Sequence, residues 1–213
     1  MQSIGLFFKI LWSPREAMLQ ASKNPRIVAP MLCVCFFSML NGSAMLISSD
    51  ALREQMSVPQ MALFLFGSFA APLIVILIVA GAYFSIFTII GREGGFKTFF
   101  SITAFAFAPF VFSSIAALFR AVVGQPSSLS LNQIGSISPA VWLDRDSVSP
   151  VLFAGVNAID LVSIWILALL ATGYGFVATK NLSSSARTGA IVGVFLAYVG
   201  LVLVMAAVGV TQN

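Results

Sequence analysis

A single carboxylate lies inside the apolar stretches of this chain, and it belongs to Asp160. An acidic side chain within a membrane-spanning segment is typical of an ion or proton path. The competing interpretation is structural: if Asn157 caps a helix, Asp160 falls in its first turn, where free amides and the helix dipole stabilise an anion. We expect this helix-start role, near the external interface, and keep transport through Asp160 as the alternative. Trp165, further along the same stretch, is expected to be a packing anchor.

The residue types required by most hydrolases and zinc enzymes are missing. The chain contains no histidine, which excludes a serine–histidine pair and an HExxH zinc site. Cys33 and Cys35 fall in one apolar block and point about 200° apart on a helix, so they share neither a disulfide nor a metal. No GxxxxGK[ST] phosphate loop occurs, and Gly91, Gly94 and Gly95 predict a turn instead. We expect no catalytic residue, no metal site and no cofactor.

Composition assigns the chain to the integral membrane proteins. Hydrophobic residues make up 59% of the 213 residues and charged residues only 8%, whereas soluble domains carry roughly 25% charged residues. Five apolar blocks are each long enough to cross a hydrocarbon core of about 30 Å as a helix. We therefore predict an all-α polytopic bundle of five transmembrane helices within residues 27–208. The helices are expected at about residues 27–48, 61–90, 99–123, 158–179 and 187–208.

Lysine and arginine are unevenly distributed around these blocks. Only Arg53, Arg120 and Arg145 fall on one side; the opposite side has Lys9, Arg15, Lys23, Arg26, Arg92, Lys97, Lys180 and Arg187. The positive-inside rule then makes the N-terminus cytoplasmic and the C-terminus external. Because the cations stand mostly at span ends, they indicate topology rather than a nucleic-acid partner.

The segments outside the membrane domain follow from that orientation. Residues 1–26 are expected to form a cytoplasmic segment with amphipathic, interfacial helices. Residues 124–157 form an external loop with an interfacial helix, and residues 209–213 an external tail. Within the first segment, Gln2 to Trp12 is interpreted as a helix in the membrane interface. A helix packed under the bundle is the alternative, because Leu6 and Ile10 make the opposite face apolar as well.

Prolines predict where helices begin and bend. Ser13 precedes Pro14, and Glu16 completes a capping box, so a short helix is expected to start there. Pro72 interrupts the second block, which predicts either a kink or a separate external helix that ends before it. Pro109 is expected to bend the third span.

Small residues recur at helical spacing on the last two blocks. Gly189, Gly193 and Ala197 form a small-xxx-small row, and Ala171 with Gly175 forms a shorter one. A short turn joins these blocks, so close antiparallel packing between them is expected. The same row is suited to a homodimer face.

Several short strings resemble the prokaryotic members of the Yip family. They are Ser13–Glu16 with Lys23–Pro25, Gly94–Phe96 leading into Ala104–Pro109, and Ile159, Asp160, Leu161, Ile164 and Trp165 leading into Gly173. The last string continues into Ser183–Ala186 and an apolar final span. The resemblance covers most of the chain, and it implies five spans with a cytoplasmic N-terminus and an external C-terminus. The distribution of cations indicates the same orientation independently.

Eukaryotic members of that family bind Rab-type GTPases in vesicle trafficking, partly through a long cytoplasmic N-terminal region. Here that region has only about 26 residues. The eukaryotic DLYGP and YGxxGY motifs are missing, and only Gly173, Tyr174 and Gly175 are similar to part of the second. The resemblance therefore implies a fold and a membrane location, and we do not expect Rab binding.

These features together favour a non-enzymatic membrane protein. We expect an accessory or scaffold component of membrane organisation or of a membrane assembly, in the cytoplasmic (inner) membrane of a bacterium. Its expected partners are the lipid bilayer and either other membrane proteins or further copies of the chain, with no nucleic acid. The alternative function is a small transporter or channel subunit that uses Asp160.

Overall fold

The computed structural model describes residues 2–91, 93–123, 143, 147–149, 152–153, 156, 160–177, 183–185, 188–189, 192–193 and 196. Every continuous element in these residues is an α-helix, and no strand occurs among them. The helices are α1 (Gln2–Lys9), α2 (Pro14–Lys23), α3 (Val28–Ser48), α4 (Asp50–Gln55), α5 (Val58–Ile90), α6 (Phe96–Ala106), α7 (Phe110–Val123) and α9 (Leu161–Gly175).

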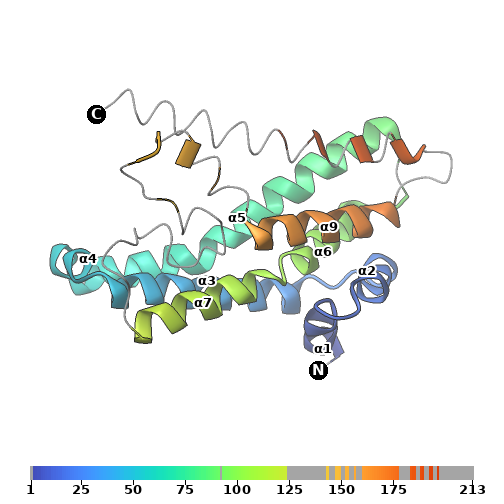
Figure 1. Ribbon diagram of the computed structural model, residues 1–213. Coiled ribbons are helices and arrows are strands. Elements are labelled where there is room, and N and C mark those ends of the chain that lie inside the picture. Colours follow the sequence, from blue (N-terminus) through green and yellow to red (C-terminus); the bar gives the residue numbers. More distant parts are fainter. Residues whose placement is uncertain are drawn as a thin grey trace.

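The long helices form an elongated bundle (Figure 1). Helix α3 lies beside α5 and α7, α9 lies beside α6, and α1 and α2 gather at the end opposite α4. Three segments are long and apolar enough to cross a membrane: α3, α5, and the stretch from Phe96 to Val123 that contains α6 and α7. The chain is therefore an all-helical, polytopic membrane protein. The predicted fifth span, residues 187–208, lies mostly outside the described residues, as do the 124–157 loop and the tail.

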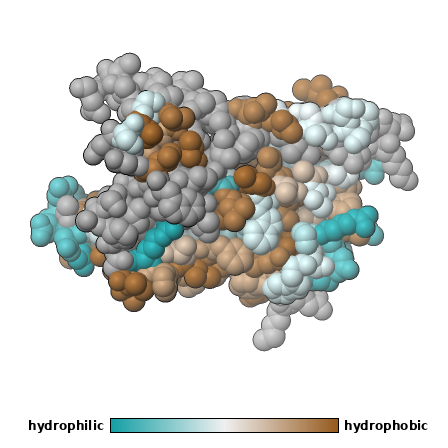
Figure 2. Space-filling model, viewed as in Figure 1, coloured by the Kyte–Doolittle hydropathy of each residue, from teal (hydrophilic) through white to brown (hydrophobic). Residues whose placement is uncertain are grey.

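The surface has the pattern of a membrane protein (Figure 2). Hydrophilic residues gather mainly at the α4 end and at the α1–α2 end, and apolar residues occupy most of the described surface between them. Large hydrophobic side chains such as Phe66, Ile78 and Ile89 are more than half exposed on α5. In water such a surface would be strongly unfavourable, whereas hydrocarbon solvates it without cost.

Helix α5 runs without interruption past Pro72. It has 33 residues, or about 50 Å of helix, so it must tilt or project beyond a hydrocarbon core of about 30 Å. Its start has the residues of a capping box, in which the side-chain oxygen of Gln60 accepts hydrogen bonds from the backbone amide of Ser57 at 2.8 Å and from the Ser57 hydroxyl at 2.9 Å. Pro72 is buried within this helix, so the alternative of a separate helix that ends before Pro72 is wrong.

The third span is divided at Pro109. Residues 107–109 form a turn between α6 and α7, and the amides of Ala108 and Phe110 donate to carbonyls three residues back instead of four. A proline at position 109 has no N–H for the carbonyl of Phe105, and its ring would crowd that carbonyl. The Phe105 carbonyl instead accepts from the amide of Ala108 at 3.1 Å. At the position where a bend was expected, the helix is therefore interrupted by a single tight turn.

The N-terminal helices pack under the bundle. Leu6, Phe7 and Ile10 are buried in the main core, while Ile4 and Trp12 remain exposed. Helix α2 contributes its own buried face, made of Ala17, Met18 and Ala21. Of the two sequence-based interpretations of the first helix, the structure has the packed one, because the apolar side that carries Leu6 and Ile10 finds a partner surface.

The start of α2 differs from the predicted capping box. Ser13 precedes the helix, but its side chain makes no capping hydrogen bond, and its φ and ψ of −136° and 61° lie outside the extended region usual for a cap. Glu16 is paired instead with Lys9, whose ammonium donates to Oε2 at 2.8 Å. That hydrogen bond and the charge of Lys9 lower the pKa of the exposed Glu16 carboxyl.

Candidate functional site

Helix α6 lies at the centre of the described bundle. Nine consecutive residues, from Thr98 to Ala106, are buried. Helices α2, α3, α5 and α9 all contact α6, which explains why no side of this nine-residue stretch is left for solvent or lipid. Three hydroxyl side chains lie among these nine residues, those of Thr98, Ser101 and Thr103, and a buried hydroxyl needs a partner to be tolerated.

Ser101 binds the connection between α2 and α3. Its Oγ accepts a hydrogen bond from the backbone amide of Arg26 at 3.1 Å. The same hydroxyl lies 3.1 Å from the carbonyl oxygen of Arg26 and 3.4 Å from that of Ala21, to which it donates. One fully buried hydroxyl therefore holds the end of α2 and the beginning of α3 against α6.

Thr103 binds α9 through Tyr174. The Oγ1 of Thr103 donates to the carbonyl of Phe99 at 2.8 Å and lies 2.5 Å from the hydroxyl of Tyr174. A threonine hydroxyl has one proton, so if it is given to Phe99 then the phenol of Tyr174 must be the donor in the second bond. Both side chains are fully buried. This bond joins two helices through groups that have no water available to replace them.

Aromatic rings pack around the ring of Tyr174, next to its hydrogen bond with Thr103. The Tyr174 ring is stacked on Phe99 with centroids 5.2 Å apart, and its centroid lies 4.4 Å from that of Tyr83 and 5.8 Å from that of Phe87. Tyr83 and Phe87 belong to α5, so the cluster unites three helices. We call these five residues the Tyr174 cluster: Tyr83, Phe87, Phe99, Thr103 and Tyr174.

Gly173 permits the approach of α9 to its neighbours. A Cβ added at this position would collide with Cγ2 of Ile102 on α6 and lie 3.2 Å from the sulfur of Met18 on α2. Three helices thus meet where α9 has no side chain. A second close approach occurs at Gly42 of α3, where an added Cβ would lie 2.8 Å from Cβ of Ser68 on α5.

The Tyr174 cluster is suited to holding helices together rather than to catalysis. Its members carry hydroxyls and rings but no carboxylate, thiol, imidazole or ammonium, so it has no group suited to acid–base or nucleophilic chemistry at neutral pH. Within the described ranges, no three His, Cys, Asp or Glu side chains come close enough to hold a metal ion. The arrangement fixes the positions of α5, α6 and α9 relative to one another.

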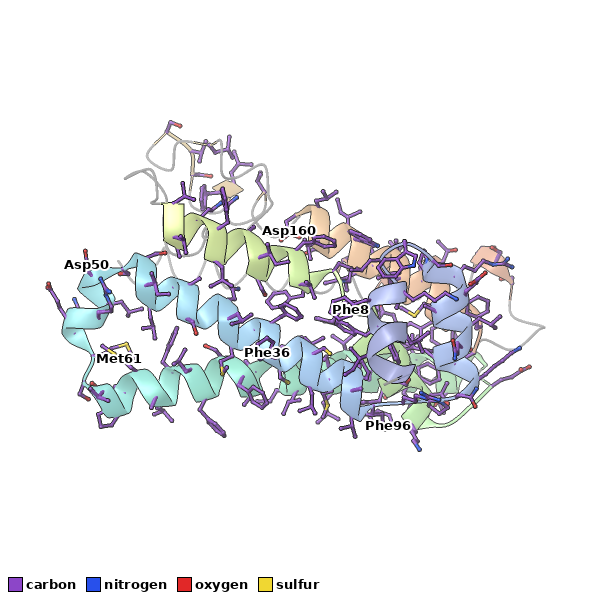
Figure 3. All side chains as sticks on the ribbon, turned by 90° about the horizontal axis from the view of Figure 1, so that it is seen from below. Phe8, Phe36, Asp50, Met61, Phe96 and Asp160 are labelled. Carbon is purple, nitrogen blue, oxygen red and sulfur yellow. The ribbon has the colours of Figure 1, made fainter. Side chains whose placement is uncertain are left out.

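Asp160 lies apart from this cluster. It is the N-cap of α9, and its Oδ1 accepts a hydrogen bond from the amide of Ser163 at 2.5 Å. Fourteen residues, or about 20 Å of helix, separate it from Tyr174. Figure 3 shows Asp160 about half-way along the bundle, well away from Asp50 at the α4 end, and its expected place near the external interface stays a prediction. The helix therefore begins one turn later than a cap at Asn157 would require, and Asn157 itself lies outside the described residues.

The other residues singled out from the sequence occupy separate places. Trp165 stacks on Phe112 of α7, with ring centroids 5.5 Å apart and planes 19° apart. Thr172 donates to the carbonyl of Ala168 on its own helix and does not approach Asp160. No described residue lies within 4 Å of a Cβ added at Gly189 or Gly193. The rest of that row lies outside the described residues, so its close packing stays a prediction.

The comparison with protein families covers nearly the entire chain. A family model described as the Yip1 domain matches residues 8–207. The chain belongs to the Yip family. Neither the search of curated proteins nor the search of solved structures gave a match.

The match to the Yip1 domain includes all the helices that form the Tyr174 cluster and the Ser101 contacts. Sequence reasoning on this Yip1-domain protein identified Gly173 but did not select Ser101, Thr103 or Tyr83. The only available signal was the presence of hydroxyls inside an apolar block. It does not reveal that Ser101 reaches Arg26 or that Thr103 reaches Tyr174, because these partners are 71 to 75 residues away.

The hydroxyl bond can be tested with a double-mutant cycle. Thr103→Val and Tyr174→Phe each remove one hydroxyl at nearly constant volume, and the pair should show a coupling free energy of about 0.6 kcal/mol, up to about 1.7 kcal/mol. The measurement is reversible unfolding of the Yip1-domain protein in mixed micelles. Strictly additive effects would contradict a direct bond between the two groups.

The close approach at Gly173 predicts a clash that a second change relieves. Gly173→Ala should destabilise the bundle by about 1–3 kcal/mol through overpacking. Ile102→Ala removes the colliding methyl group, so adding it to Gly173→Ala should cost less than it does in the native background. Gly81→Ala is the matched control, because a Cβ there meets nothing within 4 Å among the described residues. Equal losses of melting temperature for Gly173→Ala and Gly81→Ala would exclude the clash.

Proposed function

We propose that this Yip-family protein is a non-enzymatic scaffold or accessory component in membrane organisation or in a membrane assembly. The observation that carries the proposal is the composition of its core. Among the described residues, no buried side chain is charged. The buried polar groups are hydroxyls and one amide oxygen: those of Thr98, Ser101, Thr103, Ser113, Ser114, Tyr83 and Tyr174, together with Ser48 Oγ and Asn41 Oδ1. A transport path needs polar or charged groups that converge at bilayer depth, and this core is filled by apolar side chains instead.

The remaining chemistry of the described chain is at its surface. The ends of the bundle carry charges, and the belt between them is apolar, so contacts with lipid and with other membrane proteins are the interactions that this surface can make. Such a protein acts by what it binds and positions. This supports a scaffold role more than a catalytic one.

A small transporter or channel subunit is the second candidate, and one observation favours it. Asp160 is half-buried about half-way along the bundle, where a carboxylate is costly unless it is bound. The Ser163 amide supplies that binding, and the positive end of the α9 dipole adds to it. Capping therefore accounts for the acid without a transported ion.

Flux measurements distinguish the two functions. The native protein and Asp160→Asn are reconstituted into liposomes, and proton, sodium and potassium fluxes are recorded with pH- and ion-sensitive dyes. The scaffold proposal predicts flux equal to that of empty liposomes for both proteins. Asp50→Asn, which changes an exposed carboxylate on α4, is the matched control. Flux that is present in the native protein and in Asp50→Asn but lost in Asp160→Asn would establish the transporter.

We further propose a bacterial cytoplasmic membrane location with the α1–α2 end inside. The support is electrostatic: Lys9, Arg15, Lys23, Arg26 and Lys97 lie near that end of the described bundle, whereas α4 carries Arg53 together with Asp50 and Glu54.

The orientation predicts which exposed positions a membrane-impermeant maleimide can reach in intact cells. In a Cys33→Ala/Cys35→Ala background, Gln55→Cys on α4 should be labelled and Gln20→Cys on α2 should be protected until the membrane is permeabilised. Both glutamines are exposed, so accessibility within the protein is matched. The reverse labelling pattern would invert the topology, and labelling of both would contradict an odd number of spans between the two positions.

A further inference from the structure

An open groove lies at the α1–α2 end, between α1, the first half of α3 and the beginning of α6. It encloses about 830 Å³, within the range of roughly 300–1,000 Å³ typical of ligand sites. Figure 3 labels Phe8 on the α1 wall and Phe36 on the α3 wall, with Phe96 at the start of α6. Its lining residues are Ile4, Phe8, Pro25, Arg26, Ile27, Val28, Ala29, Leu32, Cys33, Phe36, Phe37 and Lys97.

The groove is apolar along its walls and cationic at one end. Of the lining residues only Arg26 and Lys97 are charged, and none is acidic. Lys97 is exposed, and no described carboxylate forms an ion pair with it. Two cations beside an apolar channel match a ligand that has an anionic head and a hydrocarbon body.

Two helices direct their positive ends to the same region. Helix α3 begins at Val28 after Ile27, and α6 begins at Phe96 after Gly95, and neither start has a side-chain cap. The amides of Val28 and Ala29 in α3, and of Phe96 and Lys97 in α6, therefore have no capping side chain, whereas Pro30 has no N–H to offer. Helix N-termini favour negative charge, so they add to the potential of the two side chains.

The length of the groove corresponds to one leaflet. Its α3 wall extends from Val28 to Phe37, nine residues further on, which is about 14 Å of helix. Half of a hydrocarbon core of about 30 Å is nearly the same length. A chain that enters beside the cations at the membrane surface would therefore end near the middle of the bilayer.

The groove is open to the surface that contacts lipid. Ile4, Val28, Leu32 and Phe36, all lining residues, are each about half exposed or more. In a chain whose long helices span the membrane, apolar side chains that are exposed on a spanning helix contact lipid. The ligand that reaches this groove is thus a component of the bilayer.

We propose that the groove is a binding site for an anionic phospholipid from the leaflet at the α1–α2 end. The phosphate lies against Arg26 and Lys97, and one acyl chain follows Leu32, Cys33 and Phe36 along α3. Bound there, the lipid also contacts α1 through Ile4 and Phe8, so it bridges the N-terminal helix and the membrane domain.

The test measures lipid binding to the full-length purified protein. Native mass spectrometry from mixed micelles compares palmitoyl-oleoyl phosphatidylglycerol with palmitoyl-oleoyl phosphatidylcholine at equal mole fraction, and glycerol phosphate is added as a water-soluble competitor. The native protein should prefer phosphatidylglycerol, and glycerol phosphate should not displace it, because the acyl chain contributes to binding.

Charge and chain contacts are tested with matched variants. Arg26→Gln/Lys97→Gln should weaken phosphatidylglycerol binding about 25-fold, since each cation near a lipid headgroup contributes about a fivefold factor. Arg15→Gln/Lys23→Gln removes two exposed cations of α2 that do not line the groove, and it should change binding less than about twofold. Leu32→Trp should obstruct the chain path, whereas Leu63→Trp, on the exposed side of α5, should not.

Three results would overturn the site. The first is an equal loss from both pairs of charge changes, which would indicate general surface charge. The second is equal binding of the two lipids, and the third is displacement by glycerol phosphate, which would indicate a soluble anion. If Arg26→Gln/Lys97→Gln has a lowered melting temperature, Lys97→Gln alone decides the matter, because Lys97 is exposed and should still give a loss of about fivefold.

Discussion

The structure depends on the burial of α6 from Thr98 to Ala106. In a bilayer a buried polar group has no water to hydrogen-bond with, so each buried hydroxyl on this helix needs a partner within the protein. Ser101 finds it in the backbone between α2 and α3, and Thr103 finds it in Tyr174 of α9. These two bonds join α6 to the α2–α3 connection and to α9. Ile102, between them in sequence, then requires a residue without a side chain on the opposing helix, and Gly173 fulfils that requirement.

The proposed function is placed on the outside of the bundle. Among the described residues the interior consists of rings, aliphatic side chains and a few polar groups without charge, whereas the surface combines an apolar belt with basic groups at one end. The groove beside α3 is where these two properties meet. A scaffold that senses or holds anionic lipid at its N-terminal helix agrees with both, since α1 packs on the bundle through one side and lines the groove with the other.

Much of the fold is predictable from local pattern. The first three apolar blocks correspond to helices whose bounds differ from the predicted ones by only a few residues, and Pro109 interrupts the third because a ring without an N–H cannot continue the ladder. The errors are also local in origin. Ser13 has the residue type of a cap but not its backbone conformation, and of the two alternatives at Pro72 the separate helix is wrong, because the proline lies within a continuous helix. The candidate site was less predictable: the sequence pointed to Gly173 and, only through a partial motif, to Tyr174, and it gave no sign of their partners on α5 and α6.

The sequence by itself determined the solvent and the secondary structure of this protein. Long apolar blocks without charge favour helices in hydrocarbon, and that inference needs no knowledge of neighbours. Only the tertiary structure decided which hydroxyl meets which partner, that Asp160 caps α9 half-way along the bundle, and that α1 packs under the bundle beside a groove. The reason is that hydrophobic periodicity does not distinguish one apolar helix from another. Their pairing depends on side-chain shape and on single polar groups 70 or more residues apart, as for Thr103 and Tyr174.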